Sequence, residues 1–338
     1  MVDGKGRRRL LVRLGQLALL LFIGWGIYQV LAPELGQVSR EDLTRWRPRG
    51  LPLAASFVLL VLFYIGHAFI WRRILVDLHI GEPGGATTLR IYFLASLGRY
   101  LPGKIWALAG LAVLAGRAGL PPGPAAAAQV LGQFGFLATG MLFLGVTLPE
   151  WPAALGAAGN ASVQAALPLT IGAVMLTAAG AGIWLLVATP LGHAFRERLA
   201  GALGPRAGDR LRAAFALADR VRPLHAAVWA GAYALSWVLL GLAFALFVAA
   251  FEPATAASPR FVAGTVAASY LVGYLFFVVP AGIGVREGAM VLLLAQVMPP
   301  AGAIVVGALS RLWFTAAELV PLALLPLLRQ TASHEEVG

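Results

Sequence analysis

Residues 91–106 read IYFLASLGRYLPGKIW, an apolar stretch that is interrupted in its second half. Leu101-Pro102-Gly103 breaks the helical pattern, and Arg99 and Lys104 lie on either side of the break. Hydrocarbon tolerates irregular backbone and cations only where protein or a water-filled cavity covers them. We therefore expect residues 91–116 to form a re-entrant helical hairpin whose tip makes an anion site.

The composition of the whole chain is that of an α-helical membrane protein. Hydrophobic residues make up 59% of its 338 residues and charged residues 12%, and stretches of about 20 apolar residues recur. We expect a single all-α integral membrane domain over residues 1–338, with seven or eight transmembrane helices. The net charge of +11 lies mostly at helix ends and loops, so positive-inside topology explains it and no nucleic-acid partner is expected.

The apolar segments and arginine-rich loops together predict a topology. The expected spans are residues 14–32, 51–71, 124–149, 163–190, 223–251 and 301–328. The loop at 192–222 holds many arginines and an amphipathic helix, which places it in the cytoplasm. Two crossings separate this loop from Arg117, so residues 91–116 should enter and leave by the inner face. The alternative is that residues 91–101 lie flat on the membrane and 102–120 form a distorted span.

Both termini are expected in the cytoplasm. The apolar run at 14–32 resembles a signal peptide, but Pro33 directly after it disfavours cleavage, so we expect a retained span. The last span ends at Arg329 on the inner side. Together with the Arg-rich and Ala-rich composition, this predicts a multi-pass protein of the bacterial inner membrane.

The second half of the chain contains a similar interrupted element at residues 261–298. Pro280, Gly282 and Gly284 break its apolar run, and Arg286 and Glu287 follow the break. Whether 261–279 crosses the membrane fully or only dips into it stays open. Paired, interrupted apolar segments in two halves of a chain are typical of inverted-repeat transporters, which bind substrate near the bilayer midplane.

Six ionisable residues lie at apparent membrane depth, and they predict a substrate-binding site. They are Arg99, Lys104, Arg286, Glu287, Arg311 and Glu318. Charges inside a bundle normally pair, so the two carboxylates should each hold an arginine, which leaves a surplus of two positive charges. Half-helix N-termini after Gly103 and Gly284 would add partial positive charge. A phosphate is the natural ligand, because arginine binds it bidentately and lysine acts as a point charge.

Other polar residues in the spans carry weaker signals. Gln129 and Gln133 share a helix face, and they either line a polar cavity or bond a neighbouring helix, which is the commoner case. His67 is best explained as a packed polar side chain. The chain lacks cysteine and shows no hydrolase, transferase, ATPase or metal-ligand motif, so we expect no cofactor, no metal and no enzymatic activity. Because no ATPase motif is present, any transport by this protein would run down a concentration gradient or be coupled to an ion.

The stretches SLGRYLPGKIWALAG (96–110) and VVPAGIGVREGAMVLLL (278–294) resemble the two signature regions of the lysylphosphatidylglycerol synthase transmembrane family. The resemblance covers roughly residues 10–330, without the soluble aminoacyl-transferring domain. It implies a helical bundle with re-entrant elements that moves a lipid headgroup between leaflets. The positions carried over by motif are Gly98, Arg99, Pro102, Gly103, Lys104, Pro280, Gly282, Gly284, Arg286 and Glu287.

The sequence therefore predicts a flippase or scramblase for an anionic phospholipid or a polyprenyl-phosphate-linked lipid. Two alternatives remain: an intramembrane transferase that uses a lipid-phosphate donor, and a non-transporting subunit of a lipid-modifying enzyme. A homodimer is also left open. The transferase needs a general base in a wet cavity, and Glu287 and Glu318 are its only candidates.

Overall fold

The computed structural model describes residues 47–100, 105–151, 193–202, 204, 216–217, 220–251, 258–275 and 284–335, with side chains in the last range placed as far as Leu324. Within these ranges every regular element is a helix, and no strand occurs. The expected all-α class is confirmed. The expected spans at 14–32 and 163–190 lie outside the described residues, as does most of the loop at 192–222, where α9 (His193–Ala202) is helical.

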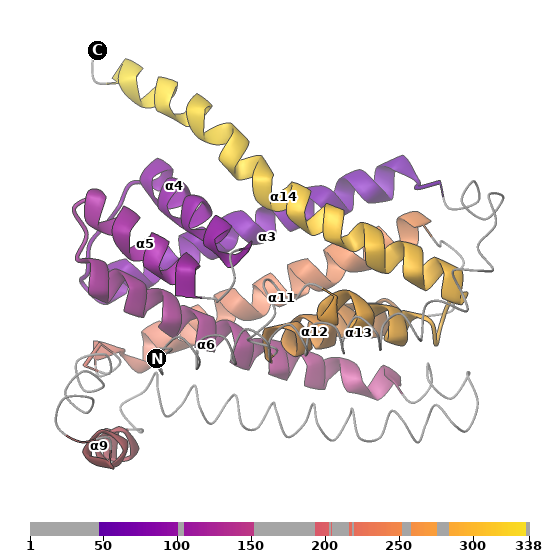
Figure 1. Cartoon of the computed structure of the whole chain (residues 1–338), viewed down its shortest axis with the longest axis horizontal. Coiled ribbons are helices and arrows are strands. Elements are labelled where there is room, and N and C mark those ends of the chain that lie inside the picture. Colours follow the sequence, from indigo (N-terminus) through magenta and orange to yellow (C-terminus); the bar gives the residue numbers. More distant parts are fainter. Residues whose placement is uncertain are drawn as a thin grey trace, which may run out of the picture.

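Four described helices are long and apolar enough to cross a membrane. They are α3 (Gly50–Asp77), α6 (Pro122–Thr147), α11 (Pro223–Phe251) and α14 (Pro300–Glu335), of which Pro300–Leu324 is the apolar part. The short 3₁₀ helix η2 (Leu148–Glu150) continues α6. These four helices run along the long axis of the bundle (Figure 1). Each of them coincides with one of the predicted spans to within a few residues, apart from the ends of α3 and α14.

The antiparallel pair of α3 and α11 is fixed at both ends. At one end the Arg49 amide donates a hydrogen bond of 2.8 Å to the Ala250 carbonyl oxygen. At the other end the Trp229 indole N–H donates to Asp77 Oδ2, also at 2.8 Å. Because these bonds hold both ends, the two helices form a scaffold with one fixed register, against which the shorter elements pack.

Helix α6 packs closely on this scaffold through small residues. A Cβ atom at Gly132 would lie 2.4 Å from the Tyr233 hydroxyl, and one at Gly140 would lie 2.3 Å from the Trp237 ring. The close approach lets Phe136 stack on Trp237 with ring centroids 4.4 Å apart and an interplanar angle of 5°. The Trp237 indole N–H also donates to the Phe136 carbonyl oxygen at 2.8 Å. The glycines thus act as contact points between helices, as their spacing predicts.

Two short helical hairpins lie against the scaffold, at opposite ends of the bundle (Figure 1). The first consists of α4 (Gly85–Ser96), the 3₁₀ turn η1 (Leu97–Tyr100) and α5 (Ile105–Arg117). The second consists of α12 (Pro259–Leu275) and α13 (Val285–Leu294). At 1.5 Å per residue α4 and α5 are about 18–20 Å long, which is too short to cross a bilayer about 30 Å thick.

Each hairpin begins and ends at one end of the bundle. For the first, a Cβ atom at Gly81, ahead of α4, would lie 2.4 Å from the side chain of Leu120, which follows α5. For the second, α12 starts beside η2, where Arg260 pairs with Glu150 at 3.5 Å, and its last turn places Gly273 against Arg286 at the start of α13. The last turn of α12 and the first turn of α13 therefore lie side by side.

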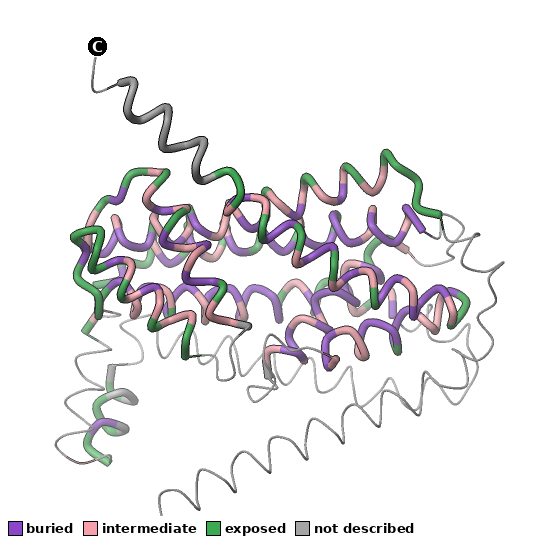
Figure 2. Tube along the Cα trace, turned by 45° about the horizontal axis from the view of Figure 1, so that its top comes forward, coloured by how far each residue is buried: buried purple, intermediate pink, exposed green. Residues whose placement is uncertain are grey.

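The core runs along the inner faces of the long helices and the hairpins. Figure 2 shows buried residues on the faces that α3, α6 and α11 turn toward each other, and exposed residues on the outer faces. The outer faces are nonetheless apolar: Val58, Leu142, Leu235 and Leu312 are all exposed. Exposed apolar side chains of this number suit contact with lipid rather than water.

Candidate functional site

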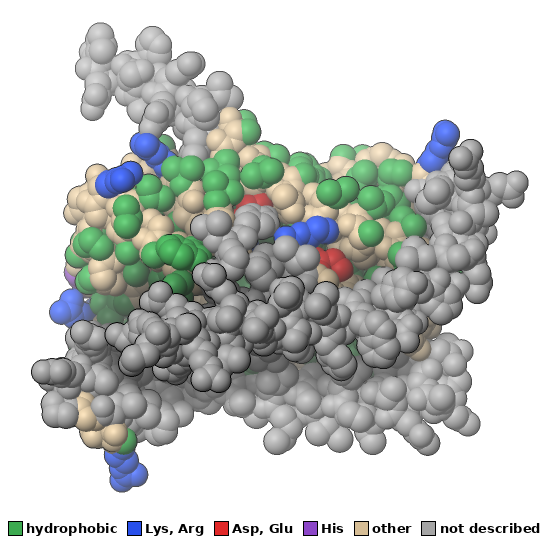
Figure 3. All heavy atoms as spheres, viewed as in Figure 1, with side chains coloured by type: hydrophobic (Ala, Val, Ile, Leu, Met, Phe, Trp, Pro, Cys, Tyr) green, Lys and Arg blue, Asp and Glu red, His purple; other side chains and the backbone are tan. Residues whose placement is uncertain are grey.

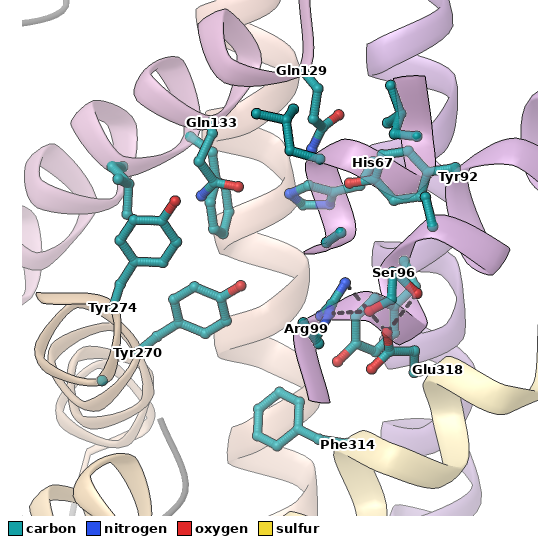
Figure 4. Close-up of a pocket in the computed structure, with 18 of the residues that line it drawn as sticks. His67, Tyr92, Ser96, Arg99, Gln129, Gln133, Tyr270, Tyr274, Phe314 and Glu318 are labelled. Carbon is teal, nitrogen blue, oxygen red and sulfur yellow. Dashed lines mark hydrogen bonds and ion pairs between the residues drawn. The ribbon is translucent and has the colours of Figure 1, made fainter. Parts of the chain in front are cut away.

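A cavity of about 500 Å³ lies in the interior, between the long helices and the two hairpins. Its lining comes from α3, α4, η1, α5, α6, α12, α13 and α14. Figure 4 shows Arg99, Ser96 and Glu318 on one side of it, Tyr270, Tyr274 and Gln133 on another, and His67, Tyr92 and Gln129 at a third. Residues far apart in the sequence therefore share one chamber.

Arg99 enters this chamber from η1 and is held in place by α14. Its Nη2 lies 3.2 Å from Glu318 Oε1, and its Nε–H donates to the Ser96 carbonyl oxygen at 3.1 Å. The Ser96 hydroxyl donates to the same Glu318 oxygen at 2.7 Å. Glu318 is only 2% exposed, so its charge is satisfied by these two groups rather than by water.

Gly98 allows this turn to sit directly on α5. A Cβ atom at Gly98 would lie 2.5 Å from the Ala107 backbone nitrogen and 2.6 Å from the Trp106 carbonyl carbon. These are backbone atoms, which cannot move aside as the end of a side chain can. Gly98, a position of the family motif, thus allows the close packing of η1 on α5. This contact positions the backbone of the next residue, Arg99.

Arg286 and Arg311 reach the chamber from α13 and α14, and both are paired with Glu287. Glu287 Oε1 lies 3.2 Å from Arg286 Nη2 and 3.7 Å from Arg311 Nη1. The Arg286 guanidinium also lies over the Phe314 ring, 4.1 Å from its centroid, which orients it. Its Nε is buried without a hydrogen-bond partner among the described residues.

Gly284 and Glu287 form the start of α13. Gly284 has φ +82°, a conformation that favours glycine, and its N–H donates to Glu287 Oε2 at 2.8 Å. Helix α13 begins at Val285, directly after Gly284, the last residue of the predicted break. The expected free N–H of this helix end is nevertheless occupied by Glu287. Glu287 itself is not among the described residues that line the cavity.

The structure thus brings four of the six predicted ionisable residues to the cavity wall: Arg99, Arg286, Arg311 and Glu318. Glu287 lies behind two of the arginines. Lys104, Pro102, Gly103, Pro280 and Gly282 lie outside the described residues. Three guanidinium groups against two carboxylates leave a surplus of one positive charge (3 − 2) among the described members of the set. Figure 3 shows basic and acidic side chains close together in the middle of the visible face, beside hydrophobic side chains.

The other side of the cavity is polar but neutral. Gln129 and Gln133 line it, and Gln129 also forms a side-chain hydrogen bond with Tyr92 of α4, so both alternatives for this pair apply in part. Four tyrosines that sequence reasoning did not single out also contribute: Tyr64, Tyr92, Tyr270 and Tyr274. Tyr270 and Tyr274 are four residues apart and so share one face of α12.

His67 packs against other side chains, as predicted, but it also lines the neutral side of the cavity. Its Nδ1 lies 2.9 Å from the Phe63 carbonyl oxygen, and its Nε2 is buried without a partner in the described part of the chain. The ring is held by Phe63 at 4.3 Å and by Phe136 at 4.7 Å between centroids. The signal that could have identified it is its position: an ionisable residue within a span is functional by default.

The described residues contain no cluster of histidine, aspartate and glutamate that could hold a metal ion. The sequence matches no family model and no curated protein. The chemistry of the site must therefore be argued from its geometry. A chamber with three guanidiniums at one side, of which only that of Arg286 is buried, and neutral hydrogen-bonding groups at the other is suited to an amphipathic ligand with an anionic group.

Proposed function

We propose that this protein is a lipid translocase that moves a lipid with an anionic phosphate headgroup across a bacterial inner membrane. In this proposal seven or eight helices span the membrane, and the α4–α5 and α12–α13 hairpins dip into it from opposite faces. The family resemblance of residues 96–110 and 278–294 belongs to the same proposal. The arginine-rich end of the bundle, with Arg72, Arg90 and Arg117, faces the cytoplasm.

The observation that carries the proposal is the position of three arginines around one interior cavity. Guanidinium groups in a bundle are normally paired, and these three contact two carboxylates, Glu287 and Glu318. A phosphate diester carries the opposite charge and matches the planar guanidinium geometry. Because Glu287 and Glu318 already partly neutralise the arginines, binding stays weak enough for release.

The arrangement of the carboxylates disfavours the transferase. Glu287 contacts two arginines and the Gly284 N–H, and Glu318 accepts from Arg99 and Ser96. A carboxylate held between cations is a poor general base, because its charged form is stabilised and its oxygens are occupied. No described contact favours the third alternative, a non-transporting subunit.

The test is translocation of fluorescent phosphatidylglycerol in liposomes, followed by dithionite quenching of the outer leaflet. Purified protein should accelerate translocation over protein-free liposomes. Arg286→Gln and Lys104→Gln should each lower the rate about tenfold, because a hydrogen bond to a charged group contributes about 1.5–3 kcal/mol. Arg260→Gln is the matched control, since Arg260 is an exposed surface arginine paired with Glu150 at 3.5 Å.

Two outcomes would contradict the proposal. If the wild-type protein moves lipid no faster than protein-free liposomes, the activity is wrong. If it does move lipid but the Arg286 and Lys104 variants keep the wild-type rate, translocation does not use this cavity.

A further inference from the structure

The neutral side of the cavity contains two buried polar atoms that no described residue satisfies. They are Nε2 of His67, from α3, and the amide Nε2 of Gln133, from α6. Buried polar groups almost always have a hydrogen-bond partner, and each exception calls for an explanation. Both residues line the same chamber as the arginines, and Figure 4 shows them with Arg99 around one open space.

These two atoms have opposite hydrogen-bonding character. A carbonyl oxygen can only accept, so the bond between His67 Nδ1 and the Phe63 carbonyl places the proton on Nδ1. In the neutral ring Nε2 is then an acceptor. The Gln133 amide nitrogen is a donor. The wall therefore presents one acceptor and one donor to whatever fills the cavity.

Both side chains are held in position. The His67 ring is clamped between Phe63 and Phe136, with Phe136 edge-on at 85°. Gln133 follows Gly132, where a Cβ atom would meet the Tyr233 hydroxyl, so its backbone lies in the turn of α6 that packs closely on α11. A rigid donor and acceptor discriminate between ligands better than mobile ones, since little ordering cost is paid on binding.

Few simple groups satisfy both atoms. An ammonium can donate to His67 but cannot accept from Gln133. A carboxylate or phosphate oxygen can accept from Gln133 but cannot donate to His67. A hydroxyl does both. Among the described lining residues the only carboxylate is Glu318, which Arg99 and Ser96 already occupy, so nothing on this wall favours a cationic headgroup.

We propose that His67 and Gln133 form a headgroup subsite that selects a hydroxylated, uncharged headgroup, such as a glycerol or a sugar, on the phosphate that the arginines bind. This inference rests on the proposed lipid translocation and adds the chemical class of the substrate. The phosphate supplies affinity and the hydroxyls supply selectivity, because a headgroup without them leaves both buried atoms unpaired.

The test compares two lipids of equal charge in the liposome assay. Phosphatidylglycerol and phosphatidylmethanol carry the same phosphate diester and the same labelled acyl chains, but only the first has headgroup hydroxyls. The wild-type protein should move phosphatidylglycerol about tenfold faster, as expected when a buried hydrogen-bonding pair is lost. His67→Phe and Gln133→Met should reduce this preference to about one, mainly by slowing phosphatidylglycerol.

Gln296→Met is the matched control, because Gln296 lies at the end of α13 and donates to the Leu292 carbonyl oxygen, away from the cavity. It should keep the tenfold preference. Thermal unfolding in detergent with short-chain forms of both lipids provides a second readout that needs no transport. Phosphatidylglycerol should raise the wild-type midpoint more than phosphatidylmethanol, and the His67 and Gln133 variants should lose that difference.

The outcomes separate this inference from the proposed function. If neither lipid moves faster than in protein-free liposomes, the proposed function fails. If both lipids move equally fast with the wild-type protein, or if the variants keep the preference, the lipid function stands and the headgroup subsite is wrong. A larger unfolding shift with free glycerol 3-phosphate than with either lipid would assign the cavity to a soluble ligand and overturn both. If water alone satisfies the two atoms, the two lipids will again be treated alike, which also contradicts the subsite.

Discussion

At the scale of single residues, Glu318 is the link between the first hairpin and the last helix. It is nearly fully buried and bonds both Arg99 and the Ser96 hydroxyl through one oxygen. A buried ion pair adds little net stability over an apolar pair of the same shape, but removing one partner is strongly destabilising. The role of Glu318 is therefore best tested with two substitutions, one that removes only the charge and one that removes all polar side-chain atoms.

We expect Glu318→Leu to lower the free energy of unfolding by about 3 kcal/mol, because it leaves the Arg99 charge without its carboxylate, whereas the Ser96 hydroxyl can still donate to the Phe93 carbonyl oxygen. Glu318→Gln should cost about 1 kcal/mol, since an amide oxygen can still accept from both groups. The measurement is reversible unfolding in mixed micelles. Glu150→Gln, which removes the charge from the exposed pair with Arg260, should change stability by less than about 0.5 kcal/mol. Equal losses for Glu318→Leu and Glu150→Gln would mean that burial does not strengthen the Arg99 pair.

The partners of these charges could not be assigned from the sequence. The general rule that charges in a bundle pair correctly predicts that Glu318 and Glu287 hold arginines. Ser96 and Glu318, however, are 222 residues apart, and only the packing of α4 on α14 brings them together. The four cavity tyrosines could not be assigned to a site from the sequence, because even the i, i+4 spacing of Tyr270 and Tyr274 is equally suited to core packing.

At the scale of elements, the first hairpin depends on how closely η1 approaches α5. Gly98→Ala should destabilise the protein by about 1–3 kcal/mol, because the added methyl group meets backbone atoms of Trp106 and Ala107. It should also slow lipid translocation, since Arg99 is the next residue. Gly231→Ala in α11 is the control, because a Cβ atom there meets nothing within 4 Å. It should be neutral or slightly stabilising. If Gly98→Ala has the same free energy of unfolding as the wild-type protein, the η1 turn can move away from α5 to accommodate the methyl group.

Element positions follow from the sequence where composition changes sharply. Helix α11 (Pro223–Phe251) has the predicted bounds, because apolar residues fill it and a proline begins it. Helix α3 continues to Asp77, past the predicted end at Trp71. Arg72 and Arg73 do not end it, because Arg72 bonds Glu82 and Arg73 bonds Asp77. Both arginines thus lie within the helix, with acceptors for their guanidinium groups close by.

At the scale of the whole molecule, the two hairpins lie at opposite ends of the bundle (Figure 1). The α4–α5 hairpin reaches inward from the end where α3 finishes, and α12–α13 reaches inward from the end where α3 begins (Figure 1). Their inner ends supply Arg99 and Arg286 to the same cavity. A site built between two opposed elements can be opened to either side by small movements of one of them, which is what alternating access requires.

This arrangement makes a prediction about topology that single cysteines can test, since the chain has none of its own. Ala86 and Ala118, which are both exposed, lie at the outer ends of the first hairpin, and Arg260 and Pro299, also exposed, lie at those of the second. In cells, a membrane-impermeant maleimide should label Arg260→Cys and Pro299→Cys from outside. It should label Ala86→Cys and Ala118→Cys only in inverted vesicles, because arginine-rich ends face the cytoplasm.

Labelling of Ala86→Cys and Ala118→Cys from opposite faces would show that residues 91–116 cross the membrane as a distorted span, and the cavity would then open by a different route. Labelling of all four from one face would contradict the opposed hairpins on which the proposed transport rests.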